Sequence, residues 1–210
     1  MSTRFCLVRH GETDWNAEKR VQGQIDIDLN ATGEPQARAL ADALADHSFA
    51  AVYSSDLCRA WRTATIAVQA RNFAVLPAPT LRERHFGVLQ GLTAAEAGMI
   101  NPAAYRLHKD RNPDFDYETG ESLNRFAARV LAGLVAMAQR HAGATVLAFT
   151  HGGVLDVVYR AATSRAIDVP RDFPLSNAAL NWLDYRAGSW HLVTWADSRH
   201  LRVALDELPG

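Results

Sequence analysis

Leu7-Val8-Arg9-His10-Gly11-Glu12-Thr13 closes a short apolar run that begins at Phe5. An apolar run of this kind, ending at a glycine turn, predicts a buried strand over residues 5–8. A buried strand that delivers an arginine and a histidine directly to a glycine is an unusual use of polar residues. His10 is therefore a candidate nucleophile, and its partners must come from other parts of the chain.

Short apolar strands alternate with amphipathic helices through the rest of the chain. Strands are predicted at 5–8, 50–54, 73–76, 145–149, 178–185 and 190–195. Helices are predicted at 34–46, from an N-cap at Ser55-Asp56 to about Ala70, at 94–99, from Glu121-Ser122 to about His141, and at 154–162. This alternation predicts an α/β fold, a three-layer α/β/α sandwich with a mostly parallel central sheet and an antiparallel strand near the C-terminus.

Residues 1–210 are expected to form a single domain, because a chain of this length can bury one substantial core. Residues 84–120 are the irregular part of the sequence and contain the short helix at 94–99. Long irregular segments inside compact domains are usually functional. We therefore expect residues 84–120 to be a substrate-specificity or lid segment.

Composition and charge narrow the class of protein. The formal net charge of −1 gives no basic surplus for nucleic acid or a membrane surface. No apolar run approaches the roughly 20 residues that cross a bilayer. The first strand follows Met1 too closely for a signal peptide, and two cysteines do not make a disulfide framework. A cytoplasmic protein, a monomer or homodimer with a small-molecule partner, is expected.

Chemically active side chains follow several of the predicted strands. They are Arg9 and His10 after the first strand, Arg59 in the helix after the second, Glu83 after the third, and His151 with Gly152-Gly153 after the strand at 145–149. Ligands of open α/β sheets bind beyond the carboxyl ends of the strands. We therefore expect these side chains to converge on one edge of the sheet.

Such a group is suited to phosphoryl transfer. The guanidinium groups of Arg9 and Arg59 match the geometry of phosphate, and the N–H groups at a helix start also favour an anion. Nearby positive charge keeps His10 neutral, so that it can attack phosphorus and form a phosphohistidine. His151 and the arginines would hold the phosphoryl oxygens, and Glu83 would protonate the leaving oxygen and then activate water.

Each residue alone also has a plainer interpretation. An Arg-His pair at a strand end can be structural, Glu83 can be a solvated carboxylate, and His151 can be a capping or core histidine. His10, His151 and Glu83 could also ligate zinc. Zinc is disfavoured because Arg9 and Arg59 would repel a cation and no His-Glu-x-x-His motif is present.

The motifs resemble those of the histidine phosphatase superfamily, the phosphoglycerate-mutase-like group, over nearly the whole chain. They are Leu7-Val8-Arg9-His10-Gly11-Glu12-Thr13 with Trp15-Asn16, Ser54-Ser55-Asp56-Leu57-Cys58-Arg59-Ala60, Leu81-Arg82-Glu83, Gly120-Glu121-Ser122 and Thr150-His151-Gly152-Gly153. Arg-His-Gly alone is a weak signal, whereas all five motifs in this order and spacing are a strong one.

The resemblance implies a catalytic group and a wider substrate-binding set. His10 would be phosphorylated and Glu83 would donate the proton. The substrate-binding residues would be Arg9, Asn16, Gln22, Gly23, Arg59, Glu83, His151 and Gly152. The resemblance implies no metal, and no other cofactor is expected.

The residues after Glu83 bear on whether the chain is a phosphatase or a mutase. Residues 83–92 are similar to the cofactor-dependent phosphoglycerate mutases, but Phe86 stands where those have a tyrosine. Residues 93–100 contain no lysine, and no adjacent arginine pair follows. A mutase must retain a bisphosphorylated intermediate with cations at the far end of the site, whereas a phosphatase needs only to admit water.

The thinner set of cations favours a phosphomonoester hydrolase that acts on a small phosphorylated metabolite. One alternative is a 2,3-bisphosphoglycerate-dependent phosphoglycerate mutase, with Arg84, Arg106, Lys109 and Arg111 as a different far-end clamp. The other alternative is a catalytically silent phosphate-binding module, although that module would be expected to lose its nucleophile or acid.

Overall fold

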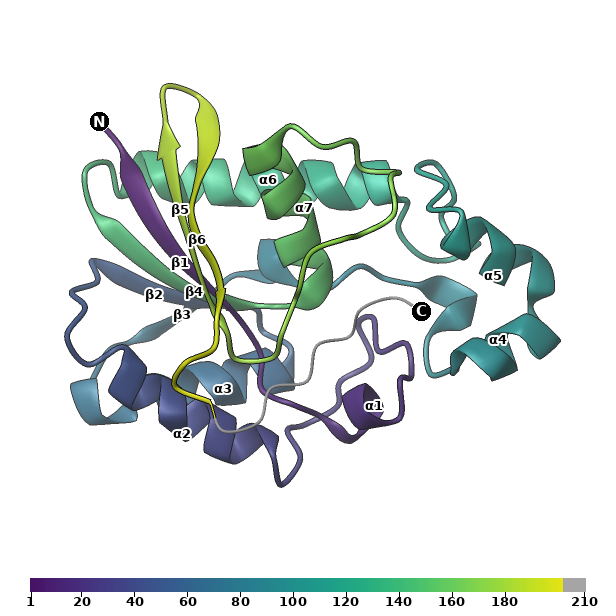
Figure 1. Ribbon diagram of the computed structural model, residues 1–210, viewed down its shortest axis with the longest axis horizontal. Coiled ribbons are helices and arrows are strands. Elements are labelled where there is room, and N and C mark those ends of the chain that lie inside the picture. The colour runs from purple at the N-terminus through teal and green to yellow at the C-terminus, as the bar shows by residue number, and fades with distance from the viewer. Residues whose placement is uncertain (202–210) are drawn as a thin grey trace.

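A computed structural model describes residues 1–201 and contains one mixed sheet between two layers of helices (Figure 1). Its strands are β1 (Thr3–Arg9), β2 (Ala51–Ser54), β3 (Val75–Pro77), β4 (Thr145–Thr150), β5 (Leu180–Arg186) and β6 (Ser189–Asp197), in the order β3-β2-β4-β1-β5-β6. β3, β2, β4 and β1 are parallel, and β5 is antiparallel to both β1 and β6. The predicted sandwich and its mostly parallel sheet are confirmed.

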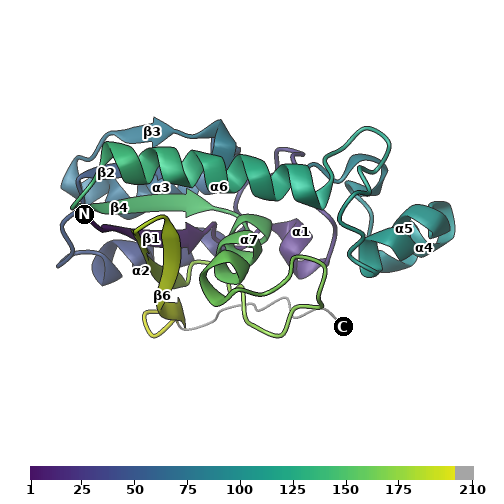
Figure 2. The ribbon, with the colours of Figure 1, turned by 90° about the horizontal axis from the view of Figure 1, so that it is seen from above.

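Helices cover both faces of the sheet. The helices are α1 (Asp14–Ala17), α2 (Gly33–Ala43), α3 (Cys58–Val68), α4 (Ala94–Ile100), α5 (Pro102–Lys109), α6 (Leu123–Arg140) and α7 (Gly152–Thr163), with 3₁₀ turns at Gln69–Arg71, Pro79–Leu81 and Gly87–Leu89. α2 and α3 lie on one side, and α6 and α7 lie on the other (Figure 2). In the described part of the chain, no helix is long and apolar enough to span a bilayer.

β1 shows why the central strands carry apolar residues on both faces. Successive side chains of a strand point to opposite faces. Phe5 and Leu7 pack with α6 and α7, whereas Cys6 and Val8 pack with α2 and α3. All four side chains are fully buried, as expected for a central strand covered on both faces.

The register of the central strands places the polar residues. Arg9 pairs with Thr150 across β1 and β4, and the His10 N–H donates to the Thr150 carbonyl at 2.9 Å. His10 and His151 therefore leave adjacent strands at the same level. The carboxyl ends of these strands point toward the end of the molecule that carries α4 and α5 (Figures 1 and 2).

The predicted N-cap of α3, residues 55–56, is wrong. The helix begins at Cys58, with Leu57 in the N-cap position and no capping side chain of its own. Asp26, from the loop before α2, accepts the Cys58 N–H at 2.7 Å instead. Both predicted capping side chains are bound to other partners, so local sequence preference is overridden by tertiary contacts.

The segment 84–120 is more regular than predicted. It contains α4 as expected, and also α5, for which no helix was predicted. Pro102 occupies the first turn of α5, where its missing N–H costs no helical hydrogen bond. The segment has a small core of its own, which contains Leu89, Ala97, Ala104 and Tyr117.

Candidate active site

His10 is held as a neutral imidazole. Its Nδ1 lies 2.7 Å from the Gly11 carbonyl, which can only accept, so Nδ1 carries the proton and Nε2 the lone pair. The ring is 3% exposed. Burial, followed by the charges of Arg59 and Arg9, holds the pKa of His10 well below its ordinary 6.5. The lone pair on Nε2 of His10 is thus available to an electrophile.

Arg59 lies against that lone pair. The first turn of α3 places it there, with Nε 3.3 Å from Nε2 of His10. Its other nitrogens donate to the carbonyls of Gly23 at 2.7 Å and Ile25 at 3.0 Å, which fix the plane of the guanidinium. Burial lowers the pKa of Arg59 to about 10, so the group remains charged at neutral pH. The predicted Gly23 therefore contributes through its carbonyl.

Arg9 supplies a second buried cation. Its Nη1 donates to the Leu175 carbonyl at 2.6 Å, and a Cβ on Gly152 would lie 3.4 Å from its Nε. Arg9 therefore crosses the first residue of α7. Leu175 belongs to the loop between α7 and β5, for which the sequence carries no local signal of a role in the site.

His151 faces His10, and the centroids of the two rings are 5.2 Å apart. Its Nε2 lies 2.8 Å from Oγ of Ser55, while its buried Nδ1 has no hydrogen-bond partner among the described residues. The Leu57 N–H points at Ser55 Oγ, at 3.4 Å, which leaves the hydroxyl free to donate to Nε2. In that arrangement, Nδ1–H of His151 is available to an oxyanion. Burial, followed by Arg59, lowers the pKa of His151 well below 6.5.

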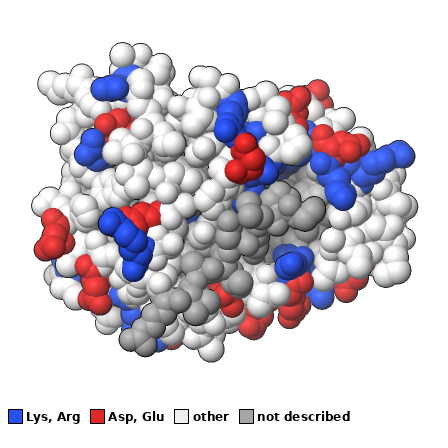
Figure 3. Space-filling model, in the orientation of Figure 1, with Lys and Arg blue, Asp and Glu red and all other residues white. Residues whose placement is uncertain are grey.

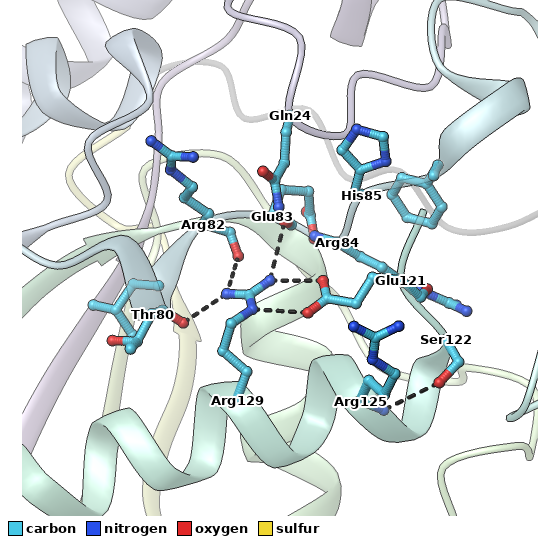
Figure 4. A network of polar contacts seen from close by, with 12 residues as sticks. Gln24, Thr80, Arg82, Glu83, Arg84, His85, Glu121, Ser122, Arg125 and Arg129 are labelled. Atoms are coloured by element: carbon cyan, nitrogen blue, oxygen red, sulfur yellow. Dashed lines mark hydrogen bonds and ion pairs between the residues drawn. The ribbon is translucent and has the colours of Figure 1, made fainter. Parts of the chain in front are cut away.

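Glu83 lies at the start of α7. Its Oε1 accepts the N–H of Arg84 at 2.7 Å, and its Oε2 accepts the N–H of Gly153 at 2.9 Å. A Cβ on Gly153 would come within 2.1 Å of Oε1, so only glycine allows this approach. Gln24 donates to the Glu83 carbonyl at 3.0 Å (Figure 4). The Glu83 carboxyl group therefore lies at the N-terminal end of α7, for which His151 is the N-cap residue.

The remaining predicted residues, Asn16 and Gln22, are also buried. Asn16 forms a capping box with Thr13. Asn177, which was not predicted, donates to the His10 carbonyl at 2.8 Å and lies 3.5 Å from the Asn16 oxygen. Gln22 precedes Gly23, and its Oε1 has no hydrogen-bond partner among residues 1–201. Because an amide can rotate, Gln22 can present N–H to an anion.

Two of the four cations named for an alternative far-end clamp, Arg84 and Arg111, are engaged in other contacts. Arg84 is buried and donates to two backbone carbonyls. Arg111 donates to Asp156 at 2.6 Å and so ties the segment 84–120 to α7. Arg106 and Lys109 are exposed on α5. The guanidinium groups of Arg84 and Arg111 are thus engaged within the fold.

The buried residues around His10 carry positive charge, whereas the protein surface carries charges of both signs. Among the described residues, no group of three His, Cys, Asp or Glu side chains is arranged to hold a metal ion. On the face shown in Figure 3, acidic and basic side chains of the described residues are interspersed. The concentrated positive charge is the buried set around His10, which suits a small anion rather than a large acidic surface.

Comparison with known proteins gives consistent matches over most of the chain. The family profile for the histidine phosphatase superfamily (branch 1) matches residues 5–198. A metal-independent phosphoserine phosphatase of Arabidopsis thaliana is 41% identical over 202 residues, covering 95% of this chain and 83% of that protein. Phosphoglycerate mutase-like protein 4 of the same plant is 38% identical over 201 residues, covering 94% and 86%. The structure of mycobacterial glucosyl-3-phosphoglycerate phosphatase complexed with VO3 aligns with a TM-score of 0.80 at 31% identity, covering 93% of this chain and 99% of that chain.

Proposed function

Since the chain belongs to branch 1 of the histidine phosphatase superfamily, we propose that it is a phosphomonoester hydrolase acting on a small phosphorylated metabolite through a phosphohistidine at His10. One observation carries the proposal. A neutral imidazole with its lone pair on Nε2 lies among buried cations, with Arg59 at 3.3 Å and, nearby, the Nδ1 of His151, which has no hydrogen-bond partner within residues 1–201.

In the first half-reaction, the phosphoryl group enters between the arginines and His151. Nε2 of His10 attacks phosphorus, and the P–N bond forms as the ester P–O bond breaks. Glu83 gives its proton to the leaving alkoxide. Arg9, Arg59 and His151 stabilise the charge that shifts onto the phosphoryl oxygens.

In the second half-reaction, Glu83 is a carboxylate and takes a proton from an incoming water. The water oxygen attacks phosphorus, the P–N bond breaks, and inorganic phosphate leaves. His10 returns to its neutral form, and Glu83 is again protonated. The two half-reactions sum to hydrolysis of the ester with one water consumed and no net change in the protein.

The bound state of two cations favours hydrolysis over mutase chemistry. Relatives include proteins named as phosphatases, such as the phosphoserine phosphatase and the glucosyl-3-phosphoglycerate phosphatase, and a protein named as phosphoglycerate mutase-like, so their names support phosphate-ester chemistry in both forms. In this chain, Arg84 and Arg111 are bound to backbone carbonyls and to Asp156, so neither is free to retain a second phosphate. We therefore propose small phosphorylated metabolites as the class of substrate, rather than one individual compound.

The experiment is phosphate release from a panel of small phosphomonoesters by the purified wild-type protein and by His10→Ala. We expect turnover by the wild type, none by the variant, and an acid-labile phosphoenzyme after rapid quenching. Assays with 3-phosphoglycerate, with and without 2,3-bisphosphoglycerate, test the mutase alternative. Formation of 2-phosphoglycerate faster than free phosphate would overturn the proposal, and so would activity retained by His10→Ala. Phosphate binding without any turnover would indicate the silent binding module.

A further inference from the structure

Arg129, in the middle of α6, lies beneath the segment that carries the proton donor. Its Nη1 donates to the carbonyls of Thr80 at 2.8 Å and Arg82 at 3.1 Å. Its Nη2 lies within hydrogen-bond distance of the Glu83 carbonyl, at 3.4 Å. Figure 4 shows this single guanidinium reaching three backbone carbonyls within four residues. Arg129 thus fixes the main chain that ends at Glu83.

Glu121 holds the guanidinium in one orientation. Nε and Nη2 of Arg129 donate to its two carboxylate oxygens, each at 2.8 Å. A bidentate arginine–carboxylate pair has a fixed plane, so the remaining N–H groups of Arg129 can point only at the chain over residues 80–83. The pair is largely shielded, with side-chain exposures of 24% and 14%. Glu121 also accepts from Arg84 through its backbone carbonyl, at 2.7 Å.

The packing of α6 makes this reach possible. Gly133 lies one turn after Arg129, and a Cβ there would come within 2.5 Å of Thr80 Oγ1. A larger residue would push α6 away from the segment. The main chain at Glu83 is held on its other side by Gln24, which donates to the same carbonyl at 3.0 Å. Arg129 makes none of the hydrogen bonds that the Glu83 carboxylate receives, which come from the N–H groups of Arg84 and Gly153.

We propose that Arg129, oriented by Glu121, is a positioning residue for Glu83. This inference rests on the proposed function, in which Glu83 protonates the leaving oxygen. Without the guanidinium, three carbonyls lose a charged donor and the segment relaxes. A displacement of a catalytic group by about 1 Å can reduce a rate about 100-fold. The effect should fall on the two steps in which Glu83 transfers a proton, of which only protonation of the leaving oxygen enters kcat/KM.

The test compares leaving groups. Arg129→Gln is assayed for kcat/KM on an alkyl phosphate that the wild type hydrolyses and on p-nitrophenyl phosphate. An alkoxide needs a proton in order to leave, whereas p-nitrophenolate does not. Because kcat/KM covers only the steps up to loss of the leaving group, later hydrolysis of the phosphohistidine does not enter. We expect a loss of about 10- to 100-fold on the alkyl phosphate and less than about 3-fold on p-nitrophenyl phosphate.

A double-variant cycle separates positioning from direct stabilisation of phosphate. In a Glu83→Gln background the proton donor is already absent, so adding Arg129→Gln should lower kcat/KM on the alkyl phosphate little further. Arg129→Lys keeps the positive charge but loses the planar fork. We expect Arg129→Lys to show most of the loss in kcat/KM that Arg129→Gln shows on the alkyl phosphate. One ammonium group cannot bind both carboxylate oxygens of Glu121 and the backbone carbonyls at the same time.

Arg111→Gln is the matched control. Arg111 is also part of a partly buried ion pair, with 23% side-chain exposure against 24% for Arg129, but it binds Asp156 and the Ile167 carbonyl. Arg111→Gln should lower the melting temperature. It should change kcat/KM by the same factor on the alkyl phosphate and on p-nitrophenyl phosphate. Equal losses on both substrates for Arg129→Gln, additivity with Glu83→Gln, or full rescue by Arg129→Lys would overturn the inference. Failure of the wild type to hydrolyse either substrate would instead overturn the proposed function.

Discussion

Nε of Arg59 lies 3.3 Å from Nε2 of His10, the ring atom that carries the lone pair. One guanidinium therefore serves two steps of the proposed reaction. Before phosphate arrives, its charge disfavours protonation of His10, second only to burial. When phosphate enters, the same Nε–H can pass from the imidazole to a phosphoryl oxygen. In the proposed reaction, the lone pair of His10 thus becomes free when Arg59 turns to the phosphoryl oxygen, and Arg59 then stabilises the charge on that oxygen.

Arg59→Lys should therefore lose activity although the positive charge is kept. A lysine ammonium cannot bind the carbonyls of Gly23 and Ile25 while also facing His10. We expect kcat/KM for phosphate release to fall about 100- to 1,000-fold, the usual cost of removing one oxyanion donor. Arg62→Lys, on an exposed position of the same helix, should match the wild type. Equal activity of the two variants would contradict the role given to Arg59.

Ser55→Ala tests whether the hydroxyl selects the tautomer of His151. Without the 2.8 Å contact to Nε2, the proton of His151 is no longer directed to Nδ1, and the donor toward phosphate is lost in part of the molecules. We expect a loss of about 10-fold in kcat/KM, with recovery in Ser55→Thr. Ser54→Ala is the control, because its buried hydroxyl binds a backbone carbonyl instead of a histidine. A loss of the same size in both variants would count against a role in tautomer selection.

The five side chains predicted to converge beyond the strands could be proposed from the sequence because the sheet is parallel; they are Arg9, His10, Arg59, Glu83 and His151. Each follows an apolar strand, and parallel strands end at one edge. Their convergence is visible in the contacts between His10 and Arg59 and between Glu83 and α7. This part of the site depends only on the order of elements along the chain.

The supporting residues could not be predicted in the same way. Arg129 occupies a polar position of an amphipathic helix, where the sequence pattern indicates a solvent-facing side chain. Ser55 was interpreted as a helix cap, a role that serine commonly has. Asn177 lies in a connection without periodicity. Each of these roles depends on a contact made by residues far apart in the chain, and such contacts leave no local pattern.

Gly153→Ala should separate helix stability from catalysis. Alanine favours a helix over glycine by about 1 kcal/mol, so α7 itself should not be weakened. The new Cβ would nevertheless lie 2.1 Å from Oε1 of Glu83, and the carboxyl group would have to move. We expect a loss of about 10- to 100-fold in kcat/KM on an alkyl phosphate. Gly152→Ala, whose Cβ would lie 3.4 Å from Arg9 Nε, should lose less. The reverse order would show that Glu83 is not held by this contact.

The pH dependence of stability should reveal a partly buried histidine, His108, outside the site. Burial, followed by the charges of Arg84 and Arg111, lowers the pKa of His108 to about 4 from its ordinary 6.5. Nδ1 of His108 lies 2.8 Å from the hydroxyl of Tyr117, within the core of the segment 84–120. Between these two pKa values the unfolded chain binds more protons than the folded protein. The contribution of His108 is therefore complete above pH 6.5 and is lost as the pH falls toward 4.

One pKa unit corresponds to about 1.4 kcal/mol, so His108 should account for about 2 kcal/mol of the stability lost between pH 6.5 and pH 5. Urea unfolding of the wild type and of His108→Asn at several pH values across this range measures that share. Between pH 6.5 and pH 5, we expect the free energy of unfolding of His108→Asn to fall by about 2 kcal/mol less than that of the wild type. At pH 7 the variant should be less stable than the wild type. Lys109→Gln, at the exposed neighbouring position of α5, should follow the wild-type curve. Parallel curves for the wild type and His108→Asn would mean that His108 is not held neutral in the folded protein.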